Sequence, residues 1–269
     1  MANLISWINI AVVFGSIVLF GAVGETLTEK AGNLNLGTPG IMCMGGAFGF
    51  VGAYLYETSV GNPNAFMCIL VALGTAFIVS ALGGLIYSFL TTTLHANQNV
   101  TGLTLTIFGV GLGKFFGTYV IPKGAVSTKA DFATKIFRAR IPFLSDKLGV
   151  VGDILFSYGF MMYLALIVAI CATLFLTKTR TGLNLRAVGE NPATADAAGI
   201  NVTKYKYLAT CIGAGLSGIG GLYYVLDYNQ GIWATTGQIE ALGWLAVALV
   251  IFTTWKPLNA IWGAYLFGM

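Results

Sequence analysis

The amino-acid sequence predicts an all-α fold, a polytopic transmembrane helical bundle, and two observations carry this prediction. The chain is 57% hydrophobic and only 9% charged over 269 residues, with a mean hydropathy of +0.81, which is far from the composition of soluble domains. Apolar runs of about 20 residues, the length that crosses a hydrocarbon core about 30 Å thick, recur along the whole chain. We therefore expect one membrane domain over residues 1–269 with about seven to eight spans or half-spans.

The expected spans follow the apolar runs in order. The first, Ile5–Val23, is not a removable signal, because no basic segment precedes it and no convincing small-residue cleavage site follows. The next five are Gly37–Tyr56, Ala65–Leu90, Val100–Val120, Ile154–Thr177 and Tyr207–Leu226. A last run, Trp244–Met269, is split at Lys256-Pro257, where we expect a hairpin or a kink.

Small residues at every fourth position mark two of these spans. Such a stripe lets a neighbouring backbone approach closely, which drives helix packing where lipid offers no hydrophobic force. We interpret the following residues as helix-packing positions: Gly109, Gly113, Gly117, Gly213, Ser217 and Gly221.

Polar residues interrupt or flank the spans at three places, and we take them as candidates for a solute pathway. Polar backbone at membrane depth survives where it is buried in protein or lines a cavity. The candidates are Asn33, Asn35, Asn97, Asn99, Thr104, Asn229, Gln230 and Trp233. Ordinary polar turns, bonds between neighbouring helices and an interfacial tryptophan explain the same residues, so the sequence leaves both interpretations open.

The segment 178–206 is the one long polar stretch in which capping residues delimit two short predicted helices. Thr181 is expected to cap a helix through Val188 that Gly189 closes in a left-handed turn. Asn191 with Pro192 predicts a second short helix, stopped by Gly199. A slim, alanine-rich helix surrounded by charges favours docking into another protein, whereas an amphipathic connector on the membrane surface is the alternative.

The sequence lacks the motifs and residues that several classes of function require. No phosphate-binding G-x-x-x-x-G-K-[ST] motif is present, so an ATPase has to be a separate chain. His95 is the only histidine, and the four cysteines lie in apolar runs without C-x-x-C spacing, which disfavours hydrolase, metal or redox chemistry. The net charge of +4 fits loops at a membrane rather than a nucleic-acid partner. A stand-alone secondary carrier stays open, although no acidic residue lies in mid-span.

The loop GLNLRAVGENPATADAAGINVTKYK closely resembles the coupling loop of permease subunits of bacterial ABC importers, of the ribose and nucleoside type. Three further stretches resemble the same family: GETLTEKAGNLNLGTPGIMCMGGA, HANQNVTGLTLTIFGVGLGKFFG and GWLAVALVIFTTWKPLNAIWGAYLFG. The resemblance implies that the loop docks into an ATPase through Arg186, Gly189, Glu190, Asn191, Pro192, Ala197, Ala198 and Gly199.

The resemblance also implies the setting of the chain. It predicts a multi-pass protein of the bacterial inner (plasma) membrane, with the coupling loop 178–206 cytoplasmic and the basic segment 122–153 and the N-terminus external. It implies ATPase subunits that bind ATP and Mg, a second permease subunit and an external solute-binding lipoprotein, while this chain carries no catalytic residue and no cofactor or metal of its own. Nucleosides are the first expectation for the solute and ribose- or galactose-like sugars the second.

Two departures from the family pattern bear on these expectations. Relatives often have a glutamate where Thr38-Pro39-Gly40 stands here, which affects the expected solute preference. Relatives usually continue with a further helix, so we expect a chain shortened at Met269.

Overall fold

The computed structural model describes residues 2–122, 125, 127–139, 157–233 and 237–269. Six helices in this part are long and apolar enough to cross a membrane. They are α1 (Ala2–Lys30), α2 (Thr38–Ser59), α3 (Ala65–Ser88, continued by a π-helical turn through Thr93), α4 (Gln98–Tyr119), α8 (Phe160–Lys178) and α11 (Val202–Tyr223, continued by a π-helical turn through Tyr228). The polytopic helical bundle that composition predicted is confirmed.

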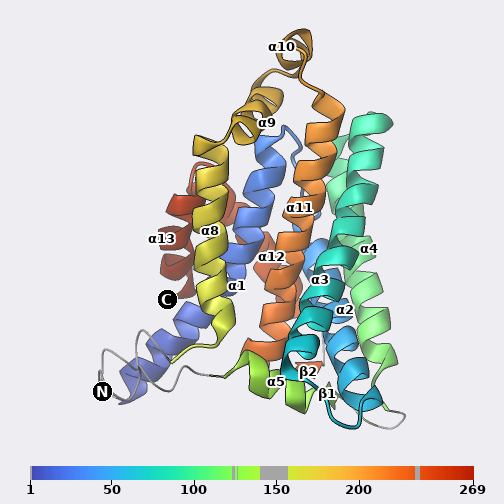
Figure 1. Ribbon diagram of the computed structural model, residues 1–269, viewed down its shortest axis with the longest axis vertical. Helices are drawn as coiled ribbons and strands as arrows, with labels where there is room; N and C mark the ends of the chain where they lie inside the picture. Colours follow the sequence, from blue (N-terminus) through green and yellow to red (C-terminus); the bar gives the residue numbers. More distant parts are fainter. Residues whose placement is uncertain (1, 123–124, 126, 140–156, 234–236) are drawn as a thin grey trace.

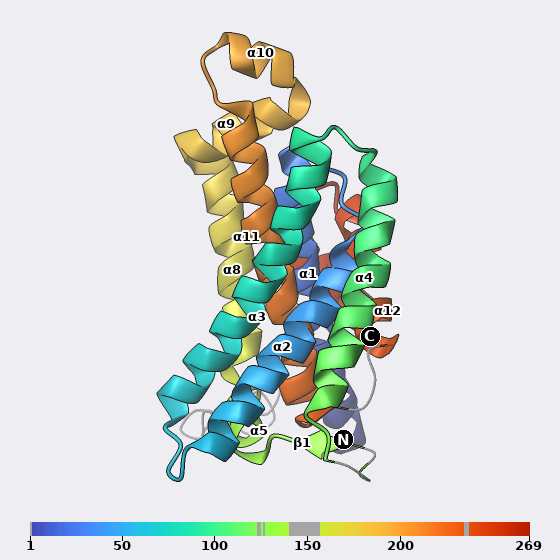
Figure 2. The same cartoon turned by 90° about the vertical axis from the view of Figure 1, so that its right-hand side faces the viewer.

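The bundle has an inner and an outer set of helices. Most of α1, α2 and α11 is buried inside the protein, whereas α3, α4 and α8 expose most of their surface (Figures 1 and 2). This division follows from side-chain size, because the inner helices meet through glycine. Gly45 of α2 faces the backbone of Gly218 of α11, and no other side chain would fit between them.

The first helix is longer than its apolar run. It continues past Val23 to Lys30, so the expected end of this span was wrong. Glu25 and Thr26 are buried in the extension. A helix satisfies its own backbone, and the buried side chains find hydrogen-bond partners within the protein, so polarity alone did not end the helix.

The last apolar run forms a hairpin at the predicted interruption. Its arms are α12 (Gly237–Phe252) and α13 (Pro257–Gly268), and Pro257 occupies the first turn of α13. Thr254 and Trp255 between them have positive φ values of 54° and 53°. Ile239 near the start of α12 lies against Gly46, in the middle of α2, so α12 is a half-span.

A small region outside the long helices, made of two short strands and one short helix, was not predicted. Strand β1 (Thr128–Lys129) pairs antiparallel with β2 (Ile232–Trp233), and α5 (Asp131–Phe137) follows β1. Glu57, near the end of α2, accepts hydrogen bonds from the amides of Phe132 (3.0 Å) and Ala133 (3.3 Å) and so caps α5. Of the predicted segment 122–153, residues 123, 124, 126 and 140–153 lie outside the described residues, as do residues 154–156 at the start of the predicted fifth span.

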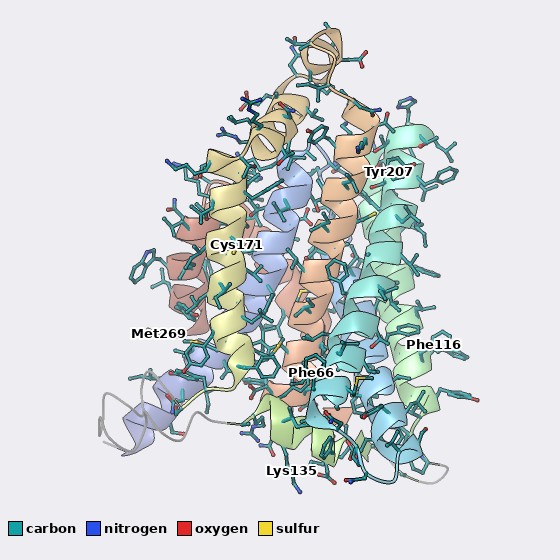
Figure 3. The ribbon with its side chains drawn as sticks, viewed as in Figure 1. Phe66, Phe116, Lys135, Cys171, Tyr207 and Met269 are labelled. Atoms are coloured by element: carbon teal, nitrogen blue, oxygen red, sulfur yellow. The ribbon has the colours of Figure 1, made fainter. Side chains whose placement is uncertain are left out.

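The connections gather at the two ends of the bundle. The short helices α9 (Arg180–Glu190) and α10 (Pro192–Ala197) protrude at one end, which we call the α10 end. Strands β1 and β2 and helix α5 lie at the opposite end, the α5 end, where Figure 3 labels Lys135. The connection between α1 and α2 and the α12–α13 turn also lie at the α10 end, because α1 and α12 both run toward it.

Candidate docking and transport sites

Residues 179–201, which we call the docking loop, are shaped by three side-chain caps. Thr179 accepts from the amide of Gly182 (3.0 Å) and caps α9, so the prediction that Thr181 is the cap was wrong by two residues. Asn191 accepts from the amide of Thr194 (3.1 Å) and caps α10 as predicted. Asn201 caps α11 through the amide of Lys204 (2.9 Å).

The corner between α9 and α10 lies at Asn191. Its backbone is extended, with φ −149° and ψ 93°. The following Pro192 disfavours helical geometry at the residue before it, so Asn191 ends α9. Gly189 is helical and does not form the predicted left-handed turn, whereas Gly199 has φ +81° and ends α10 as predicted.

The residues that the family resemblance assigned to ATPase coupling lie together on this protrusion. Arg186 and Gly189 are half-buried on α9. The others are exposed around the corner and α10: Glu190, Asn191, Pro192, Ala197, Ala198 and Gly199. The docking loop therefore exposes these residues beyond the ends of the spans, where α9 and α10 protrude from the bundle (Figure 2).

The inner side of the docking loop is held against the bundle by backbone contacts. A Cβ on Gly189 would collide with the carbonyl oxygen of Lys30, at the end of α1. A Cβ on Gly182 would collide with the carbonyl oxygen of Phe175 in α8. Leu185 and Val188, also on α9, are buried. Because glycine places backbone directly on backbone, α9 is seated on α1 and α8 without a flexible side chain between them.

The first pair of pathway candidates is buried at the α10 end. Asn33 donates from Nδ2 to the hydroxyl of Thr210 in α11 (2.9 Å). Asn35 donates its backbone amide to Oε1 of Glu25 (3.2 Å), while its side-chain oxygen accepts from the amide of Gly37 (2.9 Å). These bonds tie the α1–α2 connection to the helices around it, although the side-chain oxygen of Asn33 is buried without a hydrogen-bond partner among the described residues.

Glu25 is the centre of this connection, and we did not predict it. Its carboxyl group is buried and accepts from the hydroxyl of Thr38 (2.5 Å) as well as from Asn35. Tyr87 of α3 donates to the carbonyl oxygen of Leu34 (2.6 Å). The signal in the sequence was an acidic residue directly after an apolar run, which needs partners when it is buried.

The second group of candidates lies on α4. Asn97 caps this helix through the amides of Asn99 (3.0 Å) and Val100 (3.2 Å). Asn99 and Thr104 are exposed, and Thr104 donates to the carbonyl oxygen of Val100 (2.8 Å). These residues face away from the interior, whereas Asn33 and Asn35 are buried.

The third group lies at the α5 end, so the candidates do not form one site. Asn229 donates to the carbonyl oxygen of Ile232 (2.5 Å), and Trp233 is buried and stacked on Phe50 at 5.8 Å between ring centroids. Of the eight pathway candidates, only Gln230 lines a cavity, which has a volume of about 860 Å³. Asp227 also lines it, with Oδ1 3.6 Å from Nε of Arg138.

This cavity has a polar wall. Lys129, Lys135 and Arg138 provide positive charge, and Asp131 and Asp227 provide negative charge. Tyr158 donates to Oδ1 of Asn9 (3.0 Å), and burial raises the pKa of Tyr158 to about 12, so it stays a neutral donor. Hydrogen-bonding groups and charges of both signs thus line the cavity. Among the described residues no group of three His, Cys, Asp or Glu side chains is placed to hold a metal ion.

The predicted packing stripes lie at helix contacts. A Cβ on Gly109 or Gly113 would meet backbone of Gly40 or Cys43 in α2, and one on Gly117 would meet the ring of Trp233. Gly213 faces Gly24 of α1. Ser217 donates to the carbonyl oxygen of Gly21 (3.2 Å), and Gly221 faces the carbonyl oxygen of Met42.

These features define a polytopic membrane protein that has a structured protrusion at one end and a polar cavity at the other. Residues 6–269 match the family model described as branched-chain amino acid transport system / permease component. The chain belongs to this family of membrane transport permeases. The resemblance to ABC importer permeases is thereby confirmed.

Three relatives illustrate the range of this family. A putative glucose ABC transporter permease protein of Haloferax volcanii is 34% identical over 97% of this chain and 74% of its own length. A nucleoside ABC transporter permease protein of Lactococcus lactis subsp. cremoris is 30% identical, over 96% of this chain and 78% of its own. A guanosine ABC transporter permease protein of Bacillus subtilis is 28% identical, over 95% and 77%. No solved structure gives a significant match.

Proposed function

We propose that this chain is a permease subunit of an ATP-driven importer in the inner membrane of a bacterial cell and that it translocates nucleosides by alternating access. The observation that carries the proposal is the docking loop, whose exposed small-residue surface is fixed by glycine contacts to α1 and α8. A rigidly attached protrusion transmits movement, because no flexible segment absorbs it. The family to which the chain belongs supports this function.

The docking loop receives the ATPase on the cytoplasmic side. The sequence has no nucleotide-binding motif, so the proposal assigns ATP and Mg to the ATPase partner. Closure of two ATPase subunits moves the loop, and the helices seated against it open alternately toward each side. A second permease subunit completes the membrane part.

The polar cavity at the α5 end is the external mouth in this proposal. It receives the solute from an external binding lipoprotein, and Gln230 and Asp227 contact the solute there. Nucleosides are proposed first because two relatives are named for nucleoside or guanosine transport. The relative named for glucose transport supports a sugar as the second candidate.

A substitution in the docking loop tests the coupling role. Gly199→Val places a β-branched residue at φ +81°, a conformation that strains any L side chain, and distorts the end of α10. Gly61→Val is the matched control, since a Cβ there meets no heavy atom within 4 Å. We expect Gly199→Val to lose both copurifying ATPase and solute uptake, while Gly61→Val keeps them. If both activities persist in Gly199→Val at normal protein levels, the docking loop is not the coupling element.

The solute is tested in cells that express the complete importer. We expect saturable uptake of labelled guanosine that unlabelled nucleosides inhibit and glucose does not. Thermal-shift measurements on the partner binding protein are expected to give the same ranking. Inhibition of uptake by glucose together with no response to nucleosides would assign the sugar instead.

A further inference from the structure

One face of α9 is directed at the end of α1. Arg186 and Gly189 are three residues apart and therefore share this face. Gly189 contacts the backbone of Lys30 and Gly32. Beside this contact lies a cavity of about 140 Å³ whose wall includes Glu29, Arg186, Glu190 and Trp255. The docking loop and the end of α1 thus touch through their backbones at Gly189, and beside this contact the cavity separates them.

Arg186 is incompletely satisfied in this position. Its Nε is buried and has no hydrogen-bond partner in the described part of the chain. The ion pairs found there join Lys129 to Asp131 and Arg138 to Asp227, at the α5 end, and none involves Arg186. A buried cationic donor without a partner is unfavourable. Two carboxylates that could accept from it, those of Glu29 and Glu190, line the same cavity.

Glu29 is a carboxylate on the opposite wall, and it lies at a junction. Trp255 of the α12–α13 turn donates from Nε1 to Oε2 of Glu29. Glu25 lies one helical turn earlier on α1 and holds the connection to α2 through Asn35 and Thr38. An electrostatic attraction on the Glu29 carboxylate would therefore be transmitted to α1, to the start of α2 and to the α12–α13 hairpin.

We propose that Arg186 and Glu29 form an ion pair in another state of the transport cycle, and that this pair makes the docking loop and α1 move as one unit. The proposal rests on the proposed function, because ATPase closure supplies the movement. In that state the cavity closes and the guanidinium satisfies its unpaired Nε on Glu29. Arg186 and Glu29 are then positioning residues that couple the ATPase to the membrane helices, and neither contacts the solute.

Glu190 provides a matched control. It lines the same cavity but follows Arg186 by four residues on the same helix. A pair between Arg186 and Glu190 would stay within α9 and could not transmit movement to α1. Exchanging the charges of Arg186 and Glu29, and separately those of Arg186 and Glu190, therefore distinguishes an ion pair across the cavity from an ion pair within α9.

The experiment uses the assembled importer with its ATPases and binding protein, and it measures uptake and solute-stimulated ATP hydrolysis. We expect Arg186→Glu and Glu29→Arg each to lower the stimulated rate by about tenfold, as loss of a close charge pair does. Glu29 lies on α1 outside the docking loop, so the ATPase should still copurify with Glu29→Arg. The double variant R186E/E29R should recover to within about threefold of the original protein. The double variant R186E/E190R should not recover.

Glu29→Gln guards against a variant that fails to fold, because glutamine keeps the acceptor for Trp255 and removes the charge. It should show the same tenfold loss of stimulated ATP hydrolysis at unchanged thermal stability. Unchanged stimulation in well-folded Glu29→Gln, or no recovery in R186E/E29R, overturns the ion-pair proposal. Failure of the unmodified chain to copurify with an ATPase overturns the proposed function itself, so the two failures are distinguishable.

Discussion

The contact between α2 and α4 gives a prediction that compares two glycines on one helix. A Cβ on Gly109 would lie 2.5 Å from the carbonyl oxygen and 2.7 Å from the Cα of Gly40. Gly111 is exposed two residues later, and a Cβ there meets no heavy atom within 4 Å. We expect Gly109→Ala to destabilise the bundle and Gly111→Ala not to.

The magnitude follows from the geometry. Both contact atoms are backbone, so no side chain can turn aside, and α4 has to retreat from α2 by about 0.5–1 Å to reach ordinary van der Waals separation. Overpacking of this kind costs about 1–3 kcal/mol. The gain in helix propensity from glycine to alanine, at most about 1 kcal/mol, is common to both variants and cancels in their difference. Gly109→Ala should therefore be about 1–3 kcal/mol less stable than Gly111→Ala.

Thermal unfolding in detergent micelles, followed by far-UV circular dichroism, measures this difference. A chain of this size shifts in Tm by about 2–4 °C per kcal/mol, so Gly109→Ala should unfold about 2–12 °C below Gly111→Ala. Equal Tm values for the two variants would refute the close contact between Gly109 and Gly40, and with it the interpretation of this stripe as a packing surface.

Two further predictions concern the ends of the bundle. Thr38→Val removes a donor to the buried Glu25 carboxyl group, so its Tm should fall by the equivalent of about 1–3 kcal/mol, whereas exposed Thr104→Val should be neutral. A hydrogen bond from Lys129 lowers the pKa of Asp131. The pair stabilises the start of α5 above the ordinary aspartate pKa and loses that effect as pH falls through the lowered value. The protection of amides 128–137, measured against the intrinsic exchange rate at each pH, should then fall in the original protein, and Asp131→Asn should remove this change in protection.

Local sequence features determined the class of the fold and the shape of the docking loop. A run of apolar residues long enough to cross a membrane predicts a span wherever it stands, since lipid requires a helix there. Asn191, Pro192 and Gly199 predict a short capped helix for reasons confined to their own neighbourhood. An interruption at Lys256-Pro257, either a hairpin or a kink, was expected for the same kind of reason.

The tertiary structure decided the features that depend on distant partners. Glu25 continues α1 instead of ending it because Thr38 and Asn35 satisfy its carboxyl group. Gly189 rests on the backbone of Lys30, 159 positions earlier in the numbering, and no local pattern predicts that contact.

The sequence by itself therefore determined that this protein is a helical membrane bundle with a structured protrusion, because span length and helix caps are local properties. Only the tertiary structure decided which polar residues are buried, which line a cavity and which hold two helices together. Those outcomes depend on which residues meet across the bundle, and a hydrogen bond such as that between Asn33 and Thr210 has no signature in either local sequence. The sequence already made the docking loop a candidate coupling element, and the tertiary structure added that its glycines rest on α1 and α8.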